Sequence, residues 1–129
     1  MEFDIMDSSQ ALQSFWSGFG WTAYDSNTVP SEDEHPDMPR ITYDVSTAEF
    51  LYSIVLSASL WDRSYSWTNI SKKADEIYNK IGLGGILVPY DNGKIWIKRG
   101  SPFSQRMSDE DDAIRRIYIN IEVEFFTAK

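Results

Sequence analysis

An alternating run near the C-terminus constrains the fold of this chain more than any other feature. Apolar side chains stand at every second position of residues 117–125, and polar or amphipathic side chains fill the positions between them. A period of two is typical of a strand that buries one face and exposes the other. A slip of one residue would bury Glu122 and Glu124, so the register of this unusually long strand is strongly constrained.

Four further segments are predicted to be strands. Residues 41–46 and 52–61 also alternate, and we expect them to pair as a hairpin. Residues 86–88 and 94–98 form a second predicted hairpin, because Asn92 and Gly93 between them favour the positive φ angles of a tight turn.

Apolar residues recur at helical spacing in two places, over residues 8–19 and 70–81. The second pattern is the clearer one, because charged and polar residues fall mostly between its apolar positions. Serine, threonine and glycine stand where caps are expected. The candidate caps are Ser8 or Ser9 with Gly18 and Gly20 for the first helix, and Ser66 or Thr68 with Gly82 or Gly84 for the second.

The order helix, two strands, helix, three strands predicts an α+β fold. We expect a single mostly antiparallel sheet with two main helices packed on one face. A chain of 129 residues is long enough for one domain, which we place over residues 1–129. Residues 25–39 are rich in proline and acidic side chains and are predicted to form a polar loop.

The charge and composition exclude several classes of protein. Twelve basic against twenty acidic residues give a net charge of −8, which disfavours a general nucleic-acid-binding surface. No cysteine is present, so disulfides and thiolate chemistry are excluded. No apolar run approaches the ~20 residues of a membrane span, and residues 1–4 do not resemble a signal peptide. We therefore expect a soluble cytosolic protein without a membrane association.

Neither a metal nor a catalytic centre is predicted. The acidic run at 109–112 is the densest, but an EF-hand loop counted from Asp109 would need glycine and glutamate where Ile114 and Asn120 stand. We interpret it as a solvated turn or as a patch that faces basic residues of another subunit. The only histidine, His35, lies among acidic residues and prolines of the predicted loop, so an acidic hydrolase or metal enzyme built on it is disfavoured.

Tryptophans offer one further possibility, a small-ligand or peptide-binding module. The aromatic residues that would form its platform are Trp61, Trp67 and Trp96 with Tyr65 and Tyr90. Packing in the core is the alternative interpretation. A binding module requires an open cleft that contains both Trp61 and Trp96.

Five segments from residue 60 onward form a family-like pattern, namely W-x-x-I at 67–70, A-D-x-I at 74–77, GKIWIKRGSPFSQRM at 93–107, RRIYINI at 115–121 and EF at 124–125. This part of the sequence resembles the tail terminators, or minor tail proteins, of long-tailed bacteriophages. The opening resembles the family more loosely, in FW at 15–16, GFG at 18–20, AY at 23–24 and the residues from Pro39 to Tyr43. Tail-completion and other neck proteins share similar small folds and are the alternative within this class.

The resemblance implies a structural virion protein without enzymatic activity or cofactor. Such proteins form a ring, usually of six subunits, that caps the tail tube and stops its polymerisation. The ring then joins the tail to the head-side connector, or stopper, protein. The implied location is the head-proximal end of the tail in the virion, reached from the host cytoplasm during assembly. DNA would pass through the channel without specific binding, which suits an acidic chain.

A ring needs a contact in which one face of a subunit meets a different face of its neighbour. Our hypothesis pairs basic with acidic residues there, around aromatic anchors. The basic residues are Arg99, Arg106, Arg115 and Arg116, the acidic residues are Asp109, Asp111 and Asp112, and the anchors are Trp96 and Phe103. The alternative is that each arginine pairs within its own subunit or faces water. A lumen-facing or partner-facing role is predicted for Glu32, Asp33, Glu34 and Asp37 of the loop.

Overall fold

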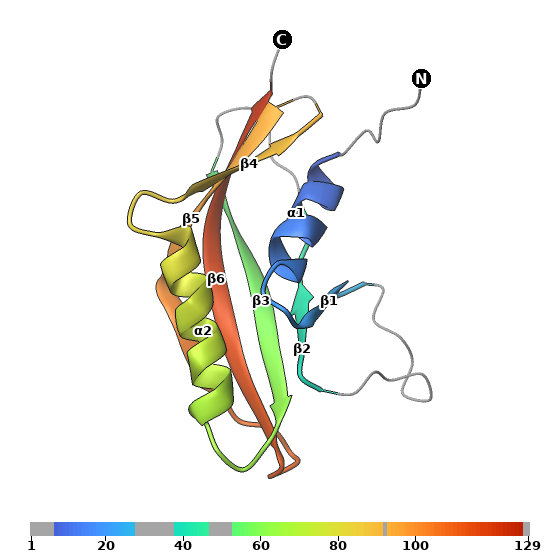
Figure 1. The fold of residues 1–129 in the computed structure, drawn as a ribbon, viewed down its shortest axis with the longest axis vertical. Coiled ribbons are helices and arrows are strands. Elements are labelled where there is room, and N and C mark those ends of the chain that lie inside the picture. The colour runs from blue at the N-terminus through green and yellow to red at the C-terminus, as the bar shows by residue number, and fades with distance from the viewer. Residues whose placement is uncertain (1–6, 28–37, 47–52, 92, 128–129) are drawn as a thin grey trace.

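A computed structural model describes residues 7–27, 38–46, 53–91 and 93–127. Two helices and six strands follow one another along these residues (Figure 1). Their bounds are α1 Ser8–Ser17, β1 Thr22–Asp25, β2 Arg40–Tyr43, β3 Ser53–Arg63, α2 Thr68–Ile81, β4 Ile86–Tyr90, β5 Gly93–Met107 and β6 Ile114–Thr127.

The strands form one curled sheet in the order β1-β2-β3-β6-β5-β4. Only β1 and β2 are parallel, and every other pair of neighbours is antiparallel. The α+β class and the single sheet with two helices are confirmed. The element order gains one strand, because β1 is four residues long and too short to show a period of its own. Asp25, predicted to begin the polar loop, is the last residue of β1, and residues 28–37 lie outside the described part of the chain.

The long alternating segment forms β6, as predicted, at the middle of the sheet. Its apolar side chains are buried, and Ile119, Ile121 and Val123 are fully so. Strand β3 pairs with β6 along its whole length, which brings Leu56 opposite Ile121. The other neighbour, β5, pairs with β6 on both sides of an irregularity between Arg99 and Ser104. The sheet therefore has a three-stranded centre, β3-β6-β5.

Both predicted hairpins are present, but the turn of the second is shifted by one residue. Strand β2 pairs with β3 and β4 pairs with β5. Gly93, expected in the turn, already belongs to β5 and pairs with Tyr90. Asn92, the other residue expected in the turn, lies outside the described residues. Pairing continues to the end of β4, which leaves only two residues for the connection.

Both helices pack on one face of the sheet (Figure 1). Helix α1 contributes Trp16, whose ring stacks on Tyr43 of β2 with the ring centroids 6.3 Å apart. Helix α2 buries four of the five residues expected on its apolar face, Ile70, Ala74, Ile77 and Ile81. The fifth, Tyr78, is 40% exposed. The opposite face of the sheet carries no helix among the described residues. None of the described helices is long and apolar enough to cross a membrane.

The N-terminal caps differ from those predicted. Asp7 caps α1, because its side chain accepts a hydrogen bond from the Gln10 amide while the Gln10 side chain accepts one from the Asp7 amide. Trp67 occupies the cap position of α2 without a side-chain cap bond. Serine and threonine at 8, 9 and 68 already lie inside the helices, whereas Gly18 and Gly82 end them as expected.

Candidate interaction surfaces

The four arginines of the predicted subunit contact each lie over an aromatic ring of their own chain. Arg99 lies 3.4 Å from the centre of the Tyr78 ring, and Arg116 lies 4.6 Å from that of Trp61. Arg106 and Arg115 share Trp67, at 4.7 and 5.3 Å. All four distances are within the range of cation–π attraction. The rings therefore hold the guanidinium groups in place without neutralising their charge.

No carboxylate of the described residues forms an ion pair with these four arginines. The ion pairs of the described chain involve Arg63 with Asp111 at 3.8 Å, Lys73 with Glu76, and Lys98 with Glu122 and Glu124. The arginines do donate hydrogen bonds within the chain, such as that from Arg99 to the Tyr78 carbonyl oxygen at 3.0 Å. None of these hydrogen bonds goes to a carboxylate, so the guanidinium charges are not neutralised by them.

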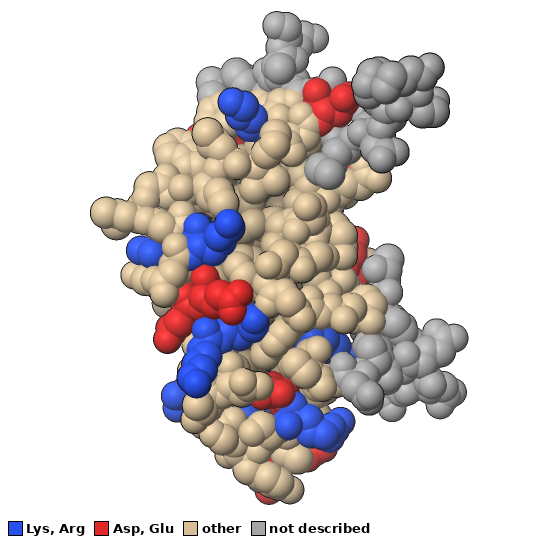
Figure 2. Space-filling model, in the orientation of Figure 1, with Lys and Arg blue, Asp and Glu red and all other residues tan. Residues whose placement is uncertain are grey.

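Several of the predicted contact residues come together at the β5–β6 turn, which we call the charged end. A cleft of about 240 Å³ there is lined by Arg106, Asp109, Asp112 and Arg115 together with Trp67. Figure 2 shows blue and red side chains close together at the lower end of the molecule, where Figure 1 places this turn. Basic and acidic residues that were predicted to meet across a subunit boundary thus lie side by side in one subunit.

The acidic run at 109–112 is an ordered turn. The Asp109 carboxylate accepts a hydrogen bond from the Asp111 amide at 3.0 Å, and the Asp111 carboxylate accepts one from the Ala113 amide at 2.8 Å. Arg115 donates a hydrogen bond to the Asp112 carbonyl oxygen at 2.9 Å, at the C-terminal end of the acidic run. These bonds use backbone groups that would otherwise need water. Within the described ranges, no group of three or more His, Cys, Asp or Glu residues is arranged to hold a metal ion.

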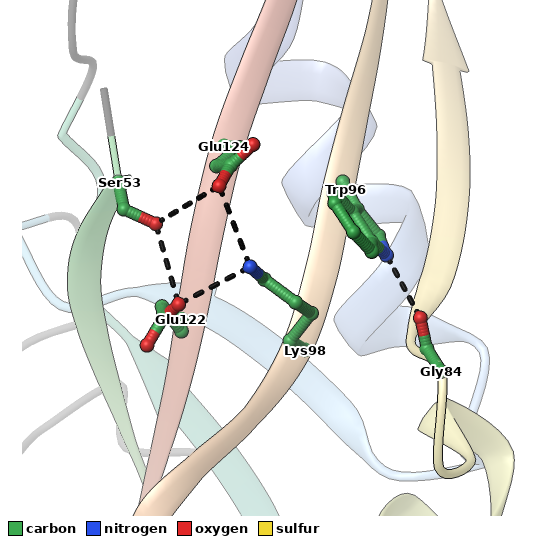
Figure 3. Close-up of polar contacts among 6 residues, drawn as sticks. All are labelled: Ser53, Gly84, Trp96, Lys98, Glu122 and Glu124. Atoms are coloured by element: carbon green, nitrogen blue, oxygen red, sulfur yellow. Dashed lines mark hydrogen bonds and ion pairs between the residues drawn. The ribbon is translucent and has the colours of Figure 1, made fainter. Parts of the chain in front are cut away.

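Trp96 lies at the other end of the long strands, in an apolar recess. The recess has a volume of about 690 Å³ and is lined by Gly84, Gly85, Ile86, Leu87, Lys94, Trp96 and Phe126. The Trp96 indole donates a hydrogen bond to the Gly84 carbonyl oxygen at 2.9 Å (Figure 3). A Cβ atom at Gly85 would lie only 2.6 Å from the indole nitrogen, so the chain approaches Trp96 more closely than any other residue permits. Gly82 ends α2 as predicted, and Gly84 and Gly85 in addition allow the chain to approach the Trp96 ring.

Next to Trp96, the open face of the sheet carries one polar cluster. Lys98 lies 3.2 Å from Glu122 and 3.4 Å from Glu124, and Ser53 donates to both carboxylates (Figure 3). Partial burial lowers the pKa of Lys98, but the hydrogen bonds and negative charges of the two glutamates together raise it more. The pKa of Lys98 therefore lies above its ordinary value, and the lysine is charged at neutral pH.

Phe103 and the two tryptophans that a binding module would need in one cleft, Trp61 and Trp96, occupy separate places. Phe103 is half-buried, and its ring meets the edge of Tyr78 with the centroids 5.2 Å apart. Trp61 lies under Arg40 and Arg116 and is not part of the Trp96 recess. A common cleft for Trp61 and Trp96 is therefore absent from the described structure.

The predicted loop residues Glu32, Asp33, Glu34 and Asp37, together with His35, lie outside the described residues. Leu83 and Leu87, which are 96% and 53% exposed, were not expected at the surface from the sequence, whereas Tyr65, named there only for an aromatic platform, is 76% exposed. The residues around these side chains do not indicate their exposure, because whether a single apolar side chain is covered depends on segments distant in the sequence. The sequence matches no known protein family model and no curated protein.

Proposed function

We propose that this chain is a structural protein of a phage-like virion that forms a ring of six subunits at the head-proximal end of the tail. The ring caps the tail tube, ends its polymerisation and joins the tail to the head-side connector. The proposal rests on the resemblance of residues 60–126 to tail terminators. It involves no catalysis and no cofactor.

One structural observation supports the proposal most strongly, namely that the two ends of the long strands differ in chemistry. The charged end holds Arg106 and Arg115 without an ion pair to any described carboxylate, and the other end holds the apolar recess around Trp96. A closed ring needs two unlike, complementary surfaces on each subunit. A subunit with such ends meets that requirement.

The proposed contact keeps both kinds of residue that the sequence indicated. The cations are Arg99, Arg106, Arg115 and Arg116, which their aromatic rings hold ready to meet carboxylates. Asp109, Asp111 and Asp112 belong to the same charged end, so across a contact between unlike ends they would face the exposed Lys94 beside the recess of the neighbouring subunit. An ordered acidic turn loses less conformational freedom on binding than a mobile one would.

Six copies of a chain with net charge −8 would surround the channel with negative charge. Repulsion between the channel wall and the phosphates would let DNA slide without specific binding. The tail tube protein and the connector are then the ring's permanent partners, above and below it.

Electron microscopy of the purified chain tests this function. We expect closed rings of one size, and tubes of abnormal length when the tail tube protein assembles without this chain. A matched sample with Arg106→Glu and Asp111→Ala should show fewer rings, because the first substitution reverses a charge at the contact and the second removes one. Tubes of unchanged length with and without the chain would contradict the proposal.

A tail-completion or other neck ring is the alternative within the same class, and the position of the ring in an assembled particle separates the two. A binding module of another class is favoured only by the recess, whose apolar lining around Trp96 suits a small ligand or peptide. Enrichment of a peptide or metabolite by a monomeric chain, lost on Leu87→Glu, would favour that second function.

A further inference from the structure

Tyr65 is an exposed aromatic side chain on a firmly held backbone. It lies between β3 and α2 and is 76% exposed. Its carbonyl oxygen accepts a hydrogen bond from Arg115 at 2.8 Å, and the neighbouring Ser64 amide donates to the Ala113 carbonyl oxygen at 2.7 Å. A tyrosine that is both exposed and positioned in this way is typical of the energetic centre of an interface.

The recess around Trp96 has the shape and chemistry that would receive such a ring. Its lining is mainly apolar, and the Trp96 and Phe126 rings lie 6.2 Å apart. Leu87, 53% exposed, forms part of its wall. Its volume of about 690 Å³ is typical of sites that bury an aromatic group.

Tyr65 cannot reach the recess of its own chain. Arg115, which holds Tyr65, is near the start of β6, and Phe126, which lines the recess, is near its end. Strand β6 has 14 residues, so at about 3.3 Å per residue the two places are roughly 40 Å apart. Figure 1 shows β4 and the loop between β3 and α2 at opposite ends of the molecule.

Charge also favours a second copy as the occupant. Lys94 lines the recess, is exposed and forms no ion pair with the described residues. Asp112 lies near Tyr65, because Arg115 donates hydrogen bonds to the carbonyl oxygens of both, and it is likewise exposed and forms no ion pair within the described chain. Seating Tyr65 of one copy in the recess of the next would bring the lysine of one copy towards the acidic turn of the other.

We propose that Tyr65 of one subunit inserts into the Trp96 recess of the neighbouring subunit, and that this contact repeats around the assembly. The contact joins unlike surfaces, so repetition closes a ring if the rotation between subunits permits. This inference rests on the proposed ring and names the residues that join its subunits.

Because the chain has no cysteine, engineered disulfides can test the contact. Chains with Ser66→Cys, which keep the Tyr65 ring, are mixed with chains with Leu87→Cys and oxidised, and covalent dimers are counted on a non-reducing gel. Both positions are exposed, so the variants should fold. The control pairs Ser66→Cys with Asp75→Cys, which is exposed on α2. A native contact should give about tenfold more dimer than the control, because it raises the effective thiol concentration. Lys94→Glu in the second chain should lower the yield.

The possible outcomes distinguish the two proposals. Rings with no excess of the Ser66→Cys and Leu87→Cys dimer over the control would overturn the Tyr65 contact and leave the ring function in place. A dimer formed mainly between two Ser66→Cys chains would also overturn it, because that contact joins like surfaces. A chain that stays monomeric without any excess cross-linking would overturn the contact and the ring together.

Discussion

Substituting Gly85 by alanine tests how the recess is built, and Gly20→Ala is its matched control. Both glycines have φ +84°, so alanine at either position has the same backbone penalty of about 1–2 kcal/mol. At Gly20 nothing lies within 4 Å of the added methyl group. At Gly85 the added carbon would lie 2.6 Å from the Trp96 indole nitrogen and 2.7 Å from the Ile97 carbonyl oxygen.

The difference between the two variants isolates the close approach to Trp96. Overpacking of this kind adds about 1–3 kcal/mol, so Gly85→Ala should lower the free energy of unfolding by roughly 2–5 kcal/mol in total. The loss for Gly20→Ala should stay at about 1–2 kcal/mol. Urea denaturation followed by tryptophan fluorescence measures both values. Equal losses for the two variants would show that Gly85 is needed for its backbone angle alone and would refute the steric argument.

Three further predictions concern a cap, a charge cluster and the charged end. Asp7→Ala should lower the free energy of unfolding by about 1 kcal/mol in a urea titration, because it removes the capping box, whereas Ser8→Ala should change it little. Replacing Lys98 by methionine should destabilise the fold at neutral pH, and the difference should shrink as the pH rises above the ordinary lysine pKa of 10.5. The direction of this pH dependence follows from the raised pKa of Lys98 in the folded state. The stabilisation by the charged lysine is complete below pH 10.5 and is lost as the pH rises through the folded-state pKa. Arg106→Glu should reduce self-association in sedimentation velocity about tenfold or more, whereas Arg106→Lys, which keeps the charge and loses the flat stacking surface over Trp67, should have an intermediate effect. Association unchanged by Arg106→Glu would remove this residue from the contact.

The elements with a period of their own could be predicted from the sequence. The period of two at β6 and the helical spacing at α2 are repeated often enough to decide both structure and buried face. Strand β1 could not be predicted, because four residues show no reliable period and its parallel partner β2 defines it as a strand. The cap of α1 was missed for a related reason. Both Asp7 and Ser8 are good capping residues, and only the position of Gln10 favours Asp7.

The candidate surfaces were predictable in composition and not in arrangement. The charged residues between Arg99 and Arg116 were selected because both signs gather in that part of the sequence. Their grouping around Trp67 depends on how α2 returns beside the β5–β6 turn, which no local pattern specifies. The recess depends on the close approach of the Gly85 backbone to Trp96, which only the folded chain reveals. Tyr65 is exposed because no distant segment packs over it, and the local sequence does not show this.

The central claim is that two unlike ends of this subunit join copies of it into a closed assembly. Native mass spectrometry across a range of protein concentrations tests that claim most directly. We predict one dominant species of six chains, with no continuing ladder of larger masses. A chain that remains a single copy at the highest concentration, or one that grows into an open series of sizes, would contradict the claim.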